Sequence, residues 1–358
     1  MFVMVIMAGF VSLAVDLGRI QLAKTEMFVA VESIARYTSA GLIDGTASSR
    51  ATCAANDNQI LGNVASIAGS DIEVGVWDPY SRTFTATTVD SNAVRVIAYR
   101  NQARGNAIHT TFGTLIGISS HDVRATAIAY RNRNVMLVVG NTSLNASDQL
   151  VYDRITSFGY HVVVKRDADV VAEDARLMRS VVISESVVSS NVGTKLKSVT
   201  VPVVCYEPFL VDDFAMSGTS AAIDYGLSTV ANRIDIRAPA HPIANGLSGV
   251  VTVSTLSDGA LEEYLAWAKI GGDGIQVASI PGNTNRSTVY AYESGTRLAD
   301  GSIAPARRAG FFGSGPLGAF SSGVPAIYWT SGAWTVFDNS FRWVTGNDPP
   351  VTTVRLSR

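Results

Sequence analysis

The chain begins with an apolar run, residues 1–15, that passes without a proline into an amphipathic stretch, residues 16–42. This pattern predicts one continuous helix that leaves a membrane and enters a soluble body. Fifteen helical residues rise only about 22 Å, whereas the hydrocarbon core of a bilayer is roughly 30 Å thick, so the span is short unless further residues precede it. We therefore expect a transmembrane anchor at residues 1–18.

Two alternatives compete with an anchor. A cleaved signal peptide has an apolar region of this length, but no basic segment precedes the run and no small-x-small site follows it. A buried core helix of a soluble protein is disfavoured because no polar face interrupts the run. Arg19 and Lys24 flank its carboxyl end, and the positive-inside rule alone would leave the body in the cytoplasm. Basic residues upstream of a truncated start would remove that conflict, and we expect an extracytoplasmic body.

Residues 15–42 read VDLGRIQLAKTEMFVAVESIARYTSAGL. This segment resembles the N-terminal anchor of the Tad (Flp) pilus assembly proteins of the TadE/TadG type, in which Asp-Leu-Gly-Arg follows an apolar span. Residues 15–19 match that opening, whereas Met27 and Phe28 replace Leu-Gln and Glu32 stands for the usual Asp. The resemblance implies membrane attachment and other pilus assembly or envelope proteins as partners. An apolar stripe recurs at helical spacing and predicts packing on the chain's own sheet; it comprises Ile20, Met27, Val31 and Ile34.

Residues 56–130 carry a second block of the same resemblance. We expect a short helix at 56–68 and strands at 72–77, 84–88, 93–100 and 122–130. The string VGVWDPYSRTFTAT and the turn around Phe112, Gly113 and Gly117 resemble the post-anchor domain of the TadE/TadG family, which implies a small α+β pilus-assembly domain at 19–131. His109 and His121 lack further ligands at metal-binding spacing, so we expect surface or turn roles and no metal.

After residue 131 the pattern changes to alternating strands and helices. Strands are expected at 135–139, 161–165, 180–184 and 202–206, with helices at 147–158, capped by Asn145 or Ser147, and at 170–178. Such alternation predicts right-handed crossovers and a parallel sheet. Further strands are expected at 250–255, 276–279, 289–292 and 307–311, and a closing helix at 332–344. The expected fold is thus an anchor helix, a small α+β domain and a three-layer α/β domain with a mainly parallel, flavodoxin-like sheet.

Residues 134–346 resemble the class I glutamine amidotransferase superfamily, and more narrowly its trehalose-utilisation (ThuA-like) branch. The residues that carry this likeness are Val138-Val139-Gly140, Ser184-Glu185-Ser186, Glu207-Pro208, residues 241–247 (HPIANGL) and the terminal Trp334, Phe337, Asp338, Arg342 and Trp343. The resemblance implies the flavodoxin-like sheet. Residues 347–358 read as a Pro-stiffened linker or tail.

Catalysis in that superfamily needs a cysteine on a sharp Gly-x-Cys-x-Gly turn. Cys205 lacks both glycines and reads as a strand interior, so we expect a buried structural thiol. Glu185 and Glu207 fall at the carboxyl ends of parallel strands, where such sheets bind ligands. With His241, which precedes a proline and is expected mainly to organise its loop, they are the candidate site residues. No pattern specifies a reaction, so an enzyme is left open and a non-catalytic domain is favoured.

Composition narrows the function further. The formal net charge is −2 and only 16% of the residues are charged, which disfavours a nucleic-acid partner. No cofactor or metal motif is present. A disulfide between Cys53 and Cys205 would cross domains, so two free thiols are expected. The sequence predicts a membrane-anchored envelope protein of a Tad pilus-type system with a non-catalytic α/β binding domain. The alternative is an anchored hydrolase or carbohydrate-processing enzyme that uses His241 with Glu185 or Glu207, and a carbohydrate ligand is left open.

Overall fold

The computed structural model describes residues 2–42, 45–79, 81–88, 91–228, 232–255, 265–313, 326–346 and 351–355, without the side chains of 2–9, 115–116, 351–352 and 355. The chain forms two compact units, Met1–Asn132 with Pro350–Arg358, and Arg133–Pro349. In the first unit, α1 (Phe2–Ala40) is one unbroken helix, as the sequence predicts. Within the described part of the chain, no helix has the length and apolarity to cross a membrane. That finding does not confirm the expected anchor at residues 1–18.

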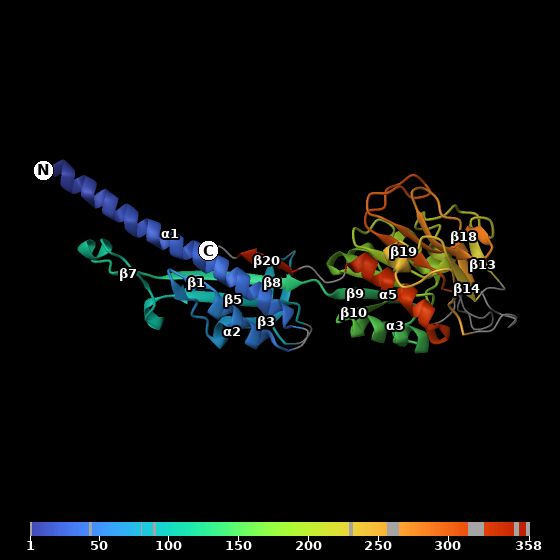
Figure 1. The fold of residues 1–358 in the computed structure, drawn as a ribbon, viewed down its shortest axis with the longest axis horizontal. Helices are drawn as coiled ribbons and strands as arrows, with labels where there is room; N and C mark the ends of the chain where they lie inside the picture. The colour runs from blue at the N-terminus through green and yellow to red at the C-terminus, as the bar shows by residue number, and fades with distance from the viewer. Residues whose placement is uncertain are drawn as a thin grey trace. The chain divides into compact units, whose positions relative to one another are not determined.

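The predicted apolar stripe of α1 packs on an antiparallel sheet. Met27, Val31 and Ile34 are fully buried and contact the inward side chains of β5 (Ala93–Arg100), among them Val94 and Val96. The sheet has the order β20-β8-β5-β3-β4, with β3 (Ile72–Asp78), β4 (Thr83–Ala86) and β8 (Val123–Arg131). Figure 1 shows α1 running along one side of these strands. The expectation of strands in this region is therefore confirmed.

The helix expected at 56–68 is wrong. The helix is α2 (Ala47–Asp57), and it is followed by the short strands β1 (Gln59–Ile60) and β2 (Asn63–Val64). Leu61 and Gly62, with φ of 50° and 74°, form the turn between them. Two consecutive left-handed residues reverse the chain and cannot continue a helix.

A second small hairpin extends from the sheet. It consists of β6 (Ile108–His109) and β7 (Ser120–His121), joined through the 3₁₀ turn η3 (Gly113–Ile116), and η2 (Gln102–Arg104) leads into it. Gly117 ends η3 in the left-handed conformation, with a φ of 84°, so the expected glycine turn is confirmed. Both histidines of the hairpin are exposed, in agreement with the surface role expected of them.

The carboxyl-terminal residues contain more than a linker or tail. Residues 347–350, the Pro-stiffened part of that expectation, lie outside the described residues. Strand β20 (Val351–Arg355), however, pairs antiparallel with β8 in the first unit, and Thr353 accepts a 2.8 Å hydrogen bond from Arg36 of α1. A β-branched run supplies a strand that covers the free edge of β8.

The second unit contains a sheet of eleven described strands. Five are parallel and lie in the order β10-β9-β11-β12-β19, with bounds β9 (Asn134–Val139), β10 (His161–Arg166), β11 (Ser180–Ile183), β12 (Val203–Cys205) and β19 (Arg308–Phe311). The others are antiparallel: β18 (Asn283–Tyr292), β17 (Ile275–Ile280), β14 (Arg233–Ile236), β15 (Val250–Thr252), β13 (Tyr225–Ser228) and β16 (Leu265–Ala268).

The sheet is thus mixed, and the expectation of a mainly parallel sheet is wrong. The tight turn at Gly282, with a φ of 76°, joins β17 directly to β18. A two-residue connection leaves no room for a crossover helix, so these strands must be antiparallel.

Helical segments cover both faces of the parallel strands. On one face, α3 (Ala146–Ser157) and α5 (Ser331–Thr345) bury side chains such as Ile155 and Phe337. The predicted docking of α5 is confirmed, since Phe337 meets Phe311 of β19 at a ring distance of 6.2 Å. The described helical segments on the other face are short: η4 (Ala172–Leu177), α4 (Ser189–Val192), η5 (Gly193–Leu196) and η6 (Pro208–Leu210). The helix expected at 170–178 is therefore reduced to the 3₁₀ segment η4.

Candidate functional site

The strand order of the second unit marks one place for a ligand. After β9 the chain passes through α3 to β10 on one side, and then returns to β11 on the other side of β9. The loops that leave the carboxyl ends of β9 and β11 therefore diverge. In open α/β sheets, ligands bind in the crevice at such a point.

Four polar residues meet beside this point, and we call them the carboxylate cluster: Asp148, Ser184, Glu185 and Ser186. Asp148 lies in the first turn of α3, whose N-cap Asn145 accepts its N–H at 2.8 Å. Its carboxylate lies 2.5 Å from the Ser184 hydroxyl and accepts a 2.8 Å hydrogen bond from the Ser186 hydroxyl. Ser184 Oγ also lies 3.1 Å from Glu185 Oε2. The cluster is thus one hydrogen-bonded network.

Gly140, directly after β9, allows these loops to approach closely. Its N–H donates to Ser186 Oγ at 3.1 Å, and a Cβ on Gly140 would lie 2.2 Å from the Ser186 carbonyl oxygen. Any larger residue would push the two loops apart. Gly140 and Ser186 therefore bring the carboxyl ends of β9 and β11 into contact.

The carboxylate cluster is buried, and burial controls its protonation. Asp148 and Glu185 are 1% and 3% exposed. Burial, together with the neighbouring Asp148, raises the pKa of Glu185 to about 8. Burial also raises the pKa of Asp148, although its hydrogen bonds from Ser184 and Ser186 oppose the effect. At this pKa Glu185 is mostly protonated at neutral pH, and Ser184 Oγ lies within hydrogen-bond distance of both Glu185 and Asp148. A neutral carboxyl of this kind can donate a hydrogen bond or a proton to a ligand.

Glu207 and Cys205 lie one strand further along the same edge. Glu207 is buried and caps η6 by accepting the Phe209 N–H at 3.2 Å. Cys205, the last residue of β12, is buried and donates its S–H to the Glu207 carbonyl at 3.6 Å. Burial raises the pKa of this thiol well above its usual range. Both cysteines are free, with Cys53 exposed.

His241 lies at the opposite edge of the sheet. It precedes η7 (Pro242–Ala244), and its Nδ1 accepts the Ile243 N–H at 3.2 Å, which is the loop-organising role expected of it. It lines a groove of about 600 Å³ together with Glu293, Arg307 and Trp343. Arg307 precedes β19 and Glu293 follows the antiparallel β18, so this groove lies at the amino end of β19. Burial lowers the pKa of His241, and Arg307 lowers it further while Glu293 opposes the shift.

The structure therefore separates the three candidate residues. Glu185 and Glu207 lie at the carboxyl edge of the parallel strands, whereas His241 lies at the amino edge, so a joint site of two carboxylates and the histidine is wrong. The sequence patterns did not identify Asp148, Ser184 and Ser186 as the residues that surround Glu185. Two signals pointed to them: an acidic residue in the first turn after the first strand, and a Ser-Glu-Ser segment after the third.

In the first unit, Asp16 of the Asp-Leu-Gly-Arg motif binds a distant loop. Its carboxylate accepts three backbone N–H groups, from Thr111 and Gly113 at 2.7 Å and from Phe112 at 2.8 Å. Asp16 is only 4% exposed. The motif residue therefore attaches the tip of the β6–β7 hairpin to α1.

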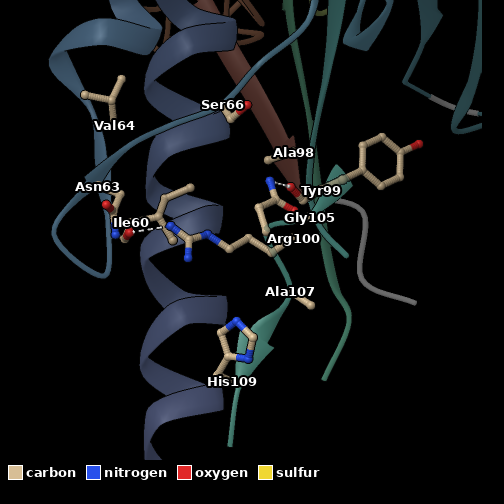
Figure 2. Close-up of a pocket in the computed structure, with 11 residues that line it drawn as sticks. Ile60, Asn63, Val64, Ser66, Ala98, Tyr99, Arg100, Gly105, Ala107 and His109 are labelled. Carbon is tan, nitrogen blue, oxygen red and sulfur yellow. Dashed lines mark hydrogen bonds between the residues drawn. The ribbon is translucent and has the colours of Figure 1, made fainter. Parts of the chain in front are cut away.

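Figure 2 shows a shallow pocket of about 350 Å³ in the same unit. The Arg100 side chain extends to the Ile60 carbonyl, to which it donates a 2.8 Å hydrogen bond, while His109 lies apart at the lower end of the pocket. Arg100 thus ties β5 to β1. Because Arg100 binds the backbone of β1, we interpret the pocket as part of the packing between these strands and not as a ligand site.

Comparison with known proteins locates one similarity. Residues 38–129 match a family model described as putative Tad-like Flp pilus-assembly. The match covers about a quarter of the chain, from the end of α1 through most of β8, and lies wholly in the first unit. No curated protein matches the chain. The match indicates a role in pilus assembly and a location in the cell envelope, whereas the amidotransferase-like resemblance of the second unit stays a prediction.

Proposed function

We propose that this protein is a membrane-anchored component of a Tad/Flp pilus-type assembly system, with a second unit that binds a partner or ligand without catalysis. The match of residues 38–129 to the pilus-assembly family carries the proposal. The apolar run at the start of α1 supports the anchor, since Phe10, Val11 and Val15 are more than half exposed. Exposed apolar side chains on one continuous helix suit a lipid environment.

The second unit supports the non-catalytic part of the proposal. Its parallel strands follow the order 2-1-3-4-5 of flavodoxin-like sheets, which favours the ThuA-like and amidotransferase-like relationship. Cys205 is buried within the sheet, without the exposed turn that presents a nucleophile and its oxyanion hole. The separation of His241 from Glu185 and Glu207 also argues against a shared catalytic centre.

Deletion of the gene in its native host tests the assembly role. We expect few or no Flp pili by electron microscopy, with restoration by the full chain. The matched variants are Glu185→Gln, which removes the titrating group from the carboxylate cluster, and Glu173→Gln at an exposed site. Both should restore pili. Normal pili in the deletion strain would refute the proposal.

One observation favours a carbohydrate-processing enzyme as a second candidate. Glu185, whose pKa is raised to about 8, lies beside a second carboxyl group, Asp148, and glycoside hydrolysis uses a pair of carboxyl groups with one of them protonated. Release of reducing sugar from envelope glycans by the wild type, and its loss in Glu185→Gln with Glu173→Gln unaffected, would favour the enzyme over the binding domain.

A further inference from the structure

We propose that the tip of the β6–β7 hairpin, residues 111–118, is a second membrane contact that enters the interfacial layer of the bilayer beside α1. The inference rests on the proposed anchoring by α1. The proposed partner of the tip is a lipid surface. Three features of the first unit support this proposal: the attachment of the tip to Asp16, the exposed apolar side chains of the tip, and the groove with cationic side chains on the other side of Asp16.

The attachment determines the level of the tip along α1. Three backbone N–H groups at residues 111–113 converge on the Asp16 carboxylate within 2.8 Å. Asp16 is the first charged residue after the apolar run, so the tip is held where α1 changes from apolar to polar. Figure 1 shows the hairpin extending along α1 toward its amino-terminal end. A carboxylate bonded to three N–H groups is also a rigid attachment.

Two large apolar side chains of the tip face solvent, beside the exposed Thr111 and Thr114. Phe112 is 37% exposed and Ile118 is 50% exposed. Neighbouring positions of α1 are equally apolar, with Phe10 at 70% exposure. Exposed apolar side chains therefore occur both on the hairpin tip and on α1 before Asp16, and exposed apolar side chains of this kind mark an interaction surface.

Basic side chains lie on the other side of Asp16. A groove of about 420 Å³ is lined by three cationic side chains and one acidic side chain, among others: Lys24 of α1, Arg95 of β5, Arg124 of β8 and Asp122. At the helical rise, Arg19 is about 4.5 Å and Lys24 about 12 Å from Asp16 along the axis. Apolar residues thus lie on one side of Asp16, and cationic side chains lie within about 12 Å of it on the other side. This order matches that of acyl chains and anionic headgroups at a membrane surface.

Site-specific fluorescence tests the contact in the full chain. An environment-sensitive dye is attached through Phe112→Cys, Ile118→Cys, Phe10→Cys or Ser81→Cys in a Cys53→Ser background, because Cys53 is exposed and Cys205 is buried. Ser81 is the matched control, since it is exposed in the β3–β4 turn at the other end of the sheet. Each protein is reconstituted into phosphatidylcholine vesicles with and without phosphatidylglycerol. We expect blue-shifted emission, quenched by lipid-attached nitroxides, at positions 10, 112 and 118, and unshifted emission at 81.

The positions separate the possible failures. Quenching at position 10 with water-exposed dyes at 112 and 118 would overturn the tip contact and leave the anchor intact. Water-exposed dyes at all positions, with protein that does not float with the vesicles, would refute the anchoring itself. A blue shift at 112 that no lipid-attached nitroxide quenches would mean that a protein covers the tip, and this would also overturn the inference. Adding Asp16→Asn should reduce quenching at 112 and 118 but not at 10, and an unchanged signal at 112 would refute the role of the attachment.

Discussion

Glu185→Gln should change how the stability of the second unit depends on pH. Glu185 is 3% exposed and its pKa is raised to about 8 by burial and by Asp148, against an ordinary value of 4.5. Between these two values the folded state holds a proton that the unfolded state releases. Stability is therefore greatest below pH 4.5 with respect to this group, falls as the pH rises toward 8, and levels off above it.

The size of the effect follows from the difference between the two pKa values. Each pKa unit corresponds to about 1.4 kcal/mol, so a difference of roughly 3.5 units lowers the free energy of unfolding by at most about 5 kcal/mol across this range. A glutamine has nearly the same shape, remains neutral and can still donate to Ser184. The variant should lose most of this dependence and be more stable than the wild type at pH 8. Some slope remains because the pKa of Asp148 is also raised.

Denaturant unfolding at a series of pH values measures this dependence. Tryptophan fluorescence reports mainly the second unit, which contains Trp267, Trp329, Trp334 and Trp343, whereas Trp77 is in the first. Glu173→Gln is the control, because its carboxylate is exposed and pairs with Arg176 at the surface. If the wild type and Glu185→Gln showed the same slope between pH 5 and 8, the account of a buried, protonated Glu185 would be refuted.

Four further predictions follow from single contacts. Asp16→Ala should speed amide hydrogen exchange at residues 111–113, whereas Asp122→Ala, which removes the acceptor of the Gln102 N–H, should leave those amides unchanged. Cys205→Ser should destabilise the second unit by about 1–3 kcal/mol if the buried hydroxyl finds no partner, while Cys205→Ala costs mainly packing; rapid reaction of native Cys205 with a glutamine-analogue alkylator would contradict its structural role. Arg308 is 2% exposed and donates hydrogen bonds to the carbonyls of Val199 and Val201. Arg308→Lys should lower the free energy of unfolding by about 3 kcal/mol, and an unchanged denaturation midpoint would count against those bonds. Residues 134–346 should unfold cooperatively when expressed alone, and a fragment without a transition would show that the boundary is misplaced.

Several elements could be derived from local patterns. The strand at 93–100 and the helix near 332–344 appear almost as expected, because alternating or helically spaced apolar residues define a buried face within one segment. The N-cap at Asn145 is local for the same reason, since a side chain satisfies an N–H three residues away. Likewise, Cys205 could be assigned to a strand from its own segment, because the glycines of a Gly-x-Cys-x-Gly turn do not flank it.

The candidate sites depended on contacts that local patterns do not encode. Asp16 lies 97 residues from Gly113, and Asp148 lies 36 residues from Ser184. The acceptor residue is visible in each case, but its donors include backbone N–H groups and serine hydroxyls, which occur throughout the chain. The pairing of β20 with β8 and the antiparallel half of the second sheet are non-local in the same way. The sequence by itself determined segments such as the strand at 93–100 and the helix near 332–344, because side-chain polarity acts within a segment. Only the tertiary structure decided which segments meet, because a free strand edge or a buried carboxylate accepts any donor that the rest of the fold brings within hydrogen-bond distance.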